Sequence, residues 1–248
     1  MYALTDPSIL KWLDRKALTG IPVSVAYDKR GAEIDFPKSL KATALKSKGL
    51  MHRKIVIIDD ATIFLGSANM TTSSLALHDN LTVGIYDPKL ALFLHKAQET
   101  VYHNGNLSLY LLPDPQKEAL LRLIGTLDAA QKSIYLAMFT LTHPDLIAAL
   151  IRAHERGVEL HLAVDYYAAR GASKKMVTLL EKAGISVKLS EGMQLLHHKW
   201  ALVDEKSLIS GSTNWTKAAF EKNHDCLLFL ESLDKDQKQN LIKIWEQL

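Results

Sequence analysis

Hydrophobic positions along this chain of 248 residues recur with two alternating periods, one helical and one extended. Apolar residues three or four apart follow Pro7 and again follow Pro144, which predicts a helix that opens at each proline. A short apolar run comes after each helix, at 23–27 and at 160–164, and predicts a strand. Alternating helices and strands indicate an α/β fold with mixed sheets.

The rest of the pattern continues in the same order, and an amphipathic helix is expected to close each half. Strands are expected at 54–58, 81–86, 107–112, 133–139, 199–203 and 227–230, with two more that end at Gly66 and Gly211. Helices are expected at 88–102, 115–130 and 234–247, the second of them capped by Asp114.

The chain repeats itself. Residues 1–7 (MYALTDP) align with residues 138–144 (MFTLTHP), and the same register continues through the first predicted strand. Eight further residues then enter the second copy. We therefore expect two halves, residues 1–105 and residues 106–248, that form α/β/α sandwiches related by a pseudo-twofold axis.

The second half contains a segment that the first half lacks. Residues 107–137 read as strand, helix and strand, and their counterpart would precede Met1. About thirty residues of the first repeat are therefore expected to be missing, through a fragment, a late start codon or a true truncation, and a naturally asymmetric first half is the alternative. A missing strand leaves a sheet edge uncovered, which favours association into a homodimer.

One motif of polar residues occurs twice, and it is the strongest signal in the sequence. The first copy reads His52-x-Lys54, four residues, Asp59, six residues and Gly66-Ser67-x-Asn69. The second copy keeps every one of these spacings, 145 residues later, with His197, Lys199, Asp204, Gly211, Ser212 and Asn214. Both copies are expected to serve one site, because chance duplication of such a set is improbable.

These residue types fit phosphodiester chemistry. Strand residues two apart share a face, so each imidazole stands beside an ammonium group, whereas Asp59 and Asp204 point away and are expected to buttress the structure. Glycine permits close approach of a ligand and the neighbouring side chains supply short donors, so the turns at Gly66 and Gly211 are expected to hold a phosphate through Ser67, Asn69, Ser212 and Asn214. Together the halves would offer proton transfer and charge stabilisation without a metal ion.

The duplicated motif resembles the signature of the phospholipase D superfamily, the HKD-motif phosphodiesterases. Because the flanking segments also repeat, the resemblance covers almost the whole chain. The resemblance implies a phospholipase D-like fold and a covalent phosphohistidine intermediate. His52 would be the nucleophile and His197 the general acid, with the opposite assignment left open by the internal symmetry. Members carry an acidic residue shortly after the Asn, so we expect Asp225 to orient His52 and Asp79 to orient His197 across the halves.

Composition narrows the picture only a little. The net charge is +3, and Cys226 is the only cysteine, which excludes a disulfide within the chain and a cysteine-based zinc cluster. No convincing metal-ligand set or cofactor motif is present, and no apolar run approaches the roughly 18 to 20 residues that span a bilayer. The chain is expected to be soluble, in an unspecified cellular location, and a targeting segment would lie in the missing N-terminal part.

The substrate is the least determined feature. Phospholipid and nucleic acid are both open, as is phosphatidyl transfer in place of hydrolysis. Tyr166, Tyr167 and Arg170, with Lys29 and Arg30 in the other half, follow strand ends and are candidates for substrate contacts. The alternative from another class is a catalytically inactive scaffold that binds phosphate or polyanions, because its shortened first half does not assemble the site.

Overall fold

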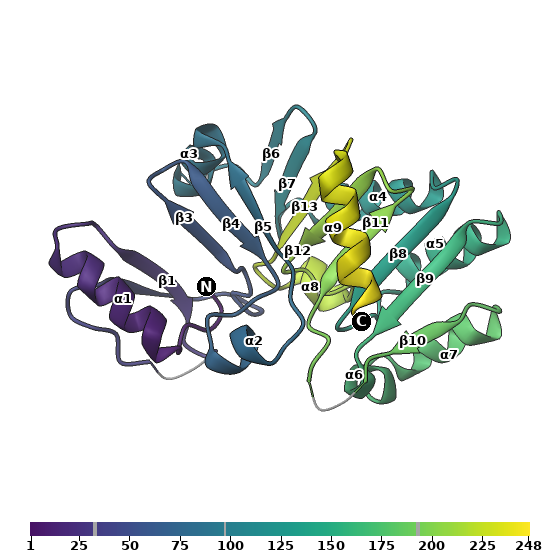
Figure 1. Cartoon of the computed structure of the whole chain (residues 1–248), viewed down its shortest axis with the longest axis horizontal. Coiled ribbons are helices and arrows are strands. Elements are labelled where there is room, and N and C mark those ends of the chain that lie inside the picture. Colours follow the sequence, from purple (N-terminus) through teal and green to yellow (C-terminus); the bar gives the residue numbers. More distant parts are fainter. Residues whose placement is uncertain (32–33, 97, 192–193) are drawn as a thin grey trace.

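The computed structural model describes residues 1–31, 34–96, 98–191 and 194–248 and has a mixed α/β architecture (Figure 1). Two lobes, each built of strands and helices, stand side by side, and the chain passes from one to the other near the middle of the sequence. The expected α/β fold with mixed sheets is confirmed.

The larger lobe is built on one eight-stranded sheet. Its strands run in the order β10-β9-β8-β11-β12-β13-β7-β6. The pairs β8/β9 and β9/β10 are parallel, and the remaining pairs are antiparallel. The strands are β6 Val101–Asn104, β7 Leu107–Leu111, β8 Ser133–Met138, β9 Glu159–Val164, β10 Val187–Leu189, β11 Lys199–Val203, β12 Ser207–Gly211 and β13 Cys226–Leu230.

Helices cover both faces of this sheet, which explains why its central strands are apolar at nearly every position. On one face α4 and α5 contact each other, and α7 packs against α5. On the other face α9 lies over the sheet, where Trp245 packs with Trp200 of β11 (Figure 1). All five residues of β7 and of β11 are buried as a result. The helices are α4 Gln116–Asp128, α5 Pro144–Glu155, α7 Lys174–Lys182 and α9 Lys235–Glu246.

The smaller lobe has two separate sheets. Strands β3, β4 and β5 form an antiparallel meander, and β1 pairs with β2 in parallel. Helix α1 begins at Pro7 as expected, and the Asp6 carboxylate accepts its first free amides. The elements are α1 Pro7–Leu18, β1 Ser24–Asp28, β2 Lys41–Leu45, β3 Ile55–Ile58, β4 Thr62–Gly66, α2 Thr72–Ala76, β5 Thr82–Tyr86 and α3 Pro88–Lys96.

The two lobes differ at one place that the repeat identifies. In the larger lobe β8 lies between β9 and β11 and pairs with both. Strands β1 and β3 are the counterparts of β9 and β11, and among the residues that the structure describes no strand joins them. Strand β3 is therefore an open sheet edge among the described residues, at the place where the repeat leads us to expect another strand.

Two expectations from the hydrophobic pattern are wrong. The helix expected at 88–102 ends at Lys96, and Val101–Asn104 forms β6, because β-branched and aromatic residues there favour a strand. Asp114 does not cap α4, whose N-cap position is Pro115, without a side-chain hydrogen bond. The pattern also did not reveal β2, β10, α6 (Tyr166–Arg170) and α7, whereas α2 and α8 (Lys217–Glu221) follow the two Gly-Ser turns, where the residues permit a helix.

The lobes meet through an apolar cluster. Ile63 and Leu65 of β4 belong to one buried group with Leu109 of β7 and Leu228 of β13, and all four side chains are fully buried. Burial of such a side chain contributes roughly 1.5–3 kcal/mol. Because β4 also contacts β12, the two Gly-Ser turns at the ends of these strands come to the same region of the molecule.

Candidate active site

Each polar motif is held by the other half of the chain. Met51 forms a parallel bridge with His224, and Leu196 forms the equivalent bridge with Asp79. The amide of His52 also donates to the carbonyl of His224 at 2.8 Å. The crossing is reciprocal, as in an isologous interface, so both motifs enter the same site.

His52 is bound to Asp225 from the other half. Its Nδ1 lies 2.8 Å from Oδ1 of Asp225, and both side chains are buried. Burial lowers the pKa of His52 and Lys54 acts in the same direction, while the Asp225 carboxylate opposes them. Burial alone would raise the pKa of Asp225, but His52 and Lys54 hold it below its ordinary value. The structure thus contains the contact that was expected between Asp225 and His52.

His197 has a different partner from the one expected. Its Nδ1 lies 3.0 Å from Oδ1 of Asn80, whereas the side chain of Asp79 is exposed. The expectation that Asp79 orients His197 is therefore wrong. At the spacing that aligns the two motifs, Asn80 corresponds to Asp225, so the repeat itself indicates Asn80 as the partner of His197. Burial lowers the pKa of His197, and the charge of Lys199 lowers it further.

The two lysines are buried beside the histidines. Nζ of Lys54 donates to the carbonyl of His52 at 2.6 Å, and Nζ of Lys199 donates to the carbonyl of His197 at 2.7 Å. Burial lowers the pKa of Lys54 to about 7. Burial also places the pKa of Lys199 well below its ordinary value, and Lys54 contributes. Because the charge of Lys54 acts on Lys199 and on both histidines, the two motifs form one electrostatic site.

An aromatic ring stands beside each histidine. Tyr2 meets His52 edge-on with ring centroids 5.2 Å apart, and Phe139 lies 5.0 Å from His197. In each half the motif ammonium group lies 5.0 Å from the centroid of the same ring. Tyr2 and Phe139 occupy equivalent positions in the repeat, and this signal was present in the sequence although motif reasoning missed it.

The serine hydroxyls position the partners of the histidines. Ser67 is buried and donates to Oδ1 of Asn80 at 2.9 Å, and Ser212 donates to Oδ1 of Asp225 at 2.6 Å. The phosphate contact expected of these two serines would compete with those hydrogen bonds. The geometry favours a positioning role for both.

The turns also require glycine and carry an asparagine. A Cβ on Gly66 or Gly211 would lie 2.1 Å or 2.2 Å from a backbone carbonyl oxygen, so only glycine permits this approach. The carboxamide oxygens of Asn69 and Asn214 are buried, with no hydrogen-bond partner among the described residues. Such paired carboxamides are suited to contact a ligand in each half.

The motif aspartates lie in a tight turn after each motif strand, where both have a φ of 53°. The carboxylate of Asp204 accepts the backbone amides of Gln131, Lys132 and Ser133, which lead into β8. Asp59 is exposed, and its side chain makes no hydrogen bond within the part of the chain that the structure describes. Asp204 thus buttresses the second half, whereas Asp59 accepts no equivalent backbone amides among the described residues.

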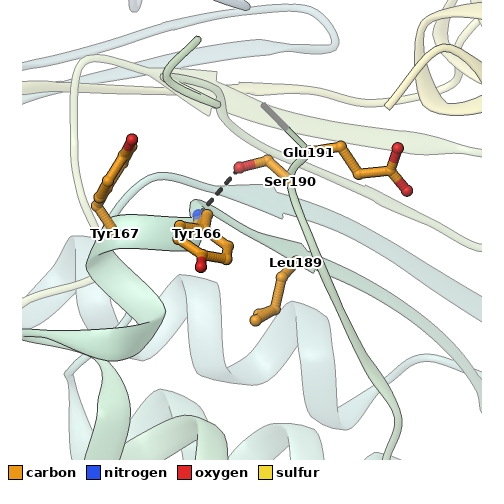
Figure 2. A pocket seen from close by; sticks show the side chains of 5 residues that line it. All are labelled: Tyr166, Tyr167, Leu189, Ser190 and Glu191. Carbon is orange, nitrogen blue, oxygen red and sulfur yellow. Dashed lines mark hydrogen bonds between the residues drawn. The ribbon is translucent and has the colours of Figure 1, made fainter. Parts of the chain in front are cut away.

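A pocket of about 540 Å³ opens beyond the carboxyl ends of β9 and β10 (Figure 2). The guanidinium of Arg170 lies over the ring of Tyr166, 4.1 Å from its centroid. The backbone amide of Tyr166 donates to Oγ of Ser190 at 2.9 Å, which ties the start of α6 to the segment that follows β10. The lining residues are Tyr166, Tyr167, Leu189, Ser190 and Glu191.

Among the basic candidates for substrate contacts in the first half, Arg30 is engaged in hydrogen bonds to neighbouring residues. Its guanidinium donates to both carboxylate oxygens of Asp28, at 2.9 Å and 2.7 Å, and to Ser47. Hydrogen bonding from Arg30 lowers the pKa of Asp28 to about 2. Tyr166 and Tyr167 are therefore better placed than Arg30 to meet a ligand.

The described residues contain no group of three or more His, Cys, Asp and Glu side chains suited to a metal ion. None of the helices there combines the length and apolar character needed to cross a membrane.

The sequence is similar to proteins related to phospholipase D. The family model described as "Cardiolipin synthase, PLD-like domain" matches residues 1–101 and 123–248. Mitochondrial cardiolipin hydrolase from Mus musculus is 36% identical over 135 residues, which cover 53% of this chain and 60% of that protein. Proteins of the same name from Canis lupus familiaris and Homo sapiens are 36% and 37% identical, and the chain spans 52% to 60% of the length of these three relatives.

Solved structures show the same fold. The phospholipase D family member Nuc from Salmonella typhimurium is 25% identical with a TM-score of 0.52, covering 57% of this chain and 93% of that one. Phosphatidylserine synthase from Haemophilus influenzae has a TM-score of 0.75 over 99% of this chain and 78% of that one. At 15% identity the second likeness concerns the fold alone.

Proposed function

We propose that this chain, which belongs to the cardiolipin synthase, PLD-like domain family of the phospholipase D superfamily, hydrolyses phosphodiester bonds with its two motif histidines. The observation that carries the proposal is the hydrogen bond between His52 and Asp225, which joins the two halves at a buried site. Two buried lysines act on the same histidines. These are the groups that nucleophilic and acid–base catalysis on phosphorus require.

In the first step His52 attacks phosphorus through Nε2. The Nδ1 proton stays on the ring and donates to Asp225, so the carboxylate stabilises the positive charge that develops on the imidazole. As the new N–P bond forms, the bond from phosphorus to the leaving oxygen breaks. His197 gives its Nε2 proton to that oxygen, and the products of the step are a free alcohol and a phosphohistidine.

In the second step His197, now neutral, accepts a proton from a water molecule. The water oxygen attacks phosphorus, the N–P bond breaks, and His52 returns to its neutral form. Lys54 and Lys199 stabilise the charge on the other phosphate oxygens throughout. An alcohol in place of water would give phosphatidyl transfer by the same route.

The histidines and lysines supply the nucleophile, the proton and the counter-charge, so we propose a metal-independent reaction. For the substrate we favour a phospholipid diester, because the mouse, dog and human relatives, which are 36–37% identical to the matched part of this chain, carry the name mitochondrial cardiolipin hydrolase. A nucleic acid contains the same phosphodiester group and is the competing source.

The test is cleavage in excess EDTA of cardiolipin vesicles, run beside a labelled single-stranded oligonucleotide. We expect release of phosphatidic acid that persists in EDTA and disappears in His197→Ala, whereas the exposed control His95→Ala keeps wild-type activity. Cleavage of the oligonucleotide alone would transfer the proposal to nucleic acid. Loss of all cleavage in EDTA would overturn metal independence, and binding of vesicles or oligonucleotide without turnover would establish the scaffold alternative.

We also propose that the open sheet edge at β3 mediates association into a homodimer. Strand β3 pairs only with β4 among the described residues, and Ile58 at its end is 46% exposed. Unpaired edges with exposed apolar side chains promote strand pairing between molecules. Light scattering after size exclusion is expected to show a dimer that Ile58→Lys converts to a monomer, and a monomeric wild-type chain at tens of micromolar would refute the dimer.

A further inference from the structure

Asn80 occupies the place at which the second half of the chain carries Asp225. Both follow the Gly-Ser turn of their own half at the same spacing, and both accept a hydrogen bond from its serine. Each also contacts the histidine of the opposite half through an oxygen. The site therefore has two histidines in equivalent positions, one facing a carboxylate and one facing a neutral amide.

The orientation of the Asn80 amide is fixed by its surroundings. Nδ2 donates to the carbonyl of Ser74 at 2.8 Å and to the carbonyl of His78 at 3.1 Å. Rotating the amide by half a turn would set its oxygen against these two carbonyl oxygens and abolish the hydrogen bond from Ser67. Oδ1 therefore faces His197, and because this oxygen can only accept, Nδ1 of His197 must donate.

We propose that Asn80 is a positioning residue that holds His197 in the Nδ1–H form and, by offering no counter-charge, assigns to it the role of proton donor, leaving His52 as the nucleophile. This inference rests on the proposed phosphodiesterase function. It resolves an assignment that the symmetry of the two motifs leaves open.

The physical reason is that the positive charge on the two imidazole rings changes in opposite directions during the first step. Positive charge grows on the nucleophile as its bond to phosphorus forms, so a carboxylate beside it interacts more strongly in the transition state than in the ground state. Positive charge falls on the acid as its proton leaves, so a carboxylate there would stabilise the ground state more. The arrangement of Asp225 at His52 and Asn80 at His197 follows this rule.

The other groups near His197 do not replace the missing carboxylate. Lys199, Lys54, His52 and His78 all act against its protonated form. Asp79 lies on the segment that bridges to Leu196, but its side chain is exposed. The anionic phosphate of a bound substrate is then the counter-charge that allows His197 to carry its proton.

The first experiment compares the pH dependence of kcat/KM for wild type, Asn80→Asp and the matched surface control Asn240→Asp. A carboxylate at position 80 stabilises protonated His197, so we expect the alkaline limb to move up by about 1 pH unit or more, with KM nearly unchanged. Asp225→Asn should instead move the acidic limb to lower pH. A shift of the opposite limb in each variant would assign His197 as nucleophile and overturn the proposal, as would no shift in Asn80→Asp.

A second measurement does not depend on turnover. In ¹⁵N spectra of labelled histidine, we expect neutral His197 to carry its proton on Nδ1 in wild type and to lose that preference in Asn80→Ala, with Asn240→Asp unchanged. A neutral His197 with its proton on Nε2 overturns the proposal even if the enzyme is active. If wild type cleaves no diester, the phosphodiesterase function fails while the tautomer can still be determined, so the two failures are distinguishable.

Discussion

His52 and Asp225 lie 173 residues apart in the chain and are joined by a hydrogen bond of 2.8 Å between Nδ1 and Oδ1. The hydroxyl of Ser212 donates a hydrogen bond to Asp225 and holds its carboxylate in place. The side chains of His52 and Asp225 are both buried. The candidate active site is therefore formed by contact between the halves. Each motif histidine has its Nδ1 partner in the opposite half, Asp225 for His52 and Asn80 for His197.

Replacement of Asp225 by Asn is expected to slow the His52 step strongly. The amide cannot stabilise the developing imidazolium, and it can present an N–H to Nδ1 and favour the wrong tautomer. We expect kcat to fall by about 10² to 10⁴, with KM changed by less than about threefold. Stopped-flow measurement of the first turnover gives the value, and a wild-type rate in this variant would remove Asp225 from the mechanism.

The matched control for that variant is Asp79→Asn. It makes the same chemical change one residue away from Asn80, on a side chain that is exposed and not bonded to His197. We expect kcat within about twofold of wild type, because surface substitutions of this kind have small effects. A large loss in Asp79→Asn would mean that the aspartate reaches the site during turnover.

The phosphorylated residue can be identified by trapping. In His197→Ala the general acid is absent, but a diester with a p-nitrophenolate leaving group needs little protonation. We expect this substrate to give a burst of p-nitrophenol and then a stalled covalent adduct, because water is no longer activated. Peptide mapping should place the phosphoryl group on His52, and an adduct elsewhere would require another nucleophile.

The buried charge of Lys54 should make stability depend on pH. Its pKa is lowered from 10.5 to about 7 in the folded state, so between these values the unfolded chain binds a proton that the folded chain does not. The free energy of unfolding should therefore rise as pH increases from about 7 to about 10. Urea unfolding at several pH values measures the slope.

Removing that charge should raise stability while it abolishes activity. Lys54→Met is expected to be more stable than wild type at pH 6 by about 1–3 kcal/mol, with the difference narrowing as pH rises. Its kcat should fall by at least about 10². The exposed control Lys235→Met should stay within about 0.5 kcal/mol of wild type. A less stable Lys54→Met would indicate that the hydrogen bond to the His52 carbonyl outweighs the burial of charge.

The two motif aspartates should differ in their effect on stability. Asp204 accepts three backbone amides that lead into β8, so Asp204→Ala is expected to lower the free energy of unfolding by about 2–4 kcal/mol. Asp59→Ala removes an exposed side chain at the equivalent turn and should change it by less than about 1 kcal/mol. Equal losses in a parallel urea titration would contradict the asymmetry between the halves.

The sequence by itself determined the repeat, the motif and most regular elements. Helices opening at Pro7 and Pro144 and strands ending at Gly66 and Gly211 follow from local periodicity, proline and glycine. The motif spacing also predicted which residues would meet at the candidate site. The correspondence between Asn80 and Asp225 is present at that spacing as well, but the expectation of an acidic residue pointed to Asp79 instead.

Only the tertiary structure decided how these groups are partnered. Periodicity says which face a side chain occupies, but a hydrogen bond across the halves depends on how β4 packs against the larger sheet. That packing buries Lys54 and Lys199, directs the serine hydroxyls to Asn80 and Asp225, and leaves Asp79 in solvent. Long-range burial and contact set the protonation of the site, and local sequence does not contain them.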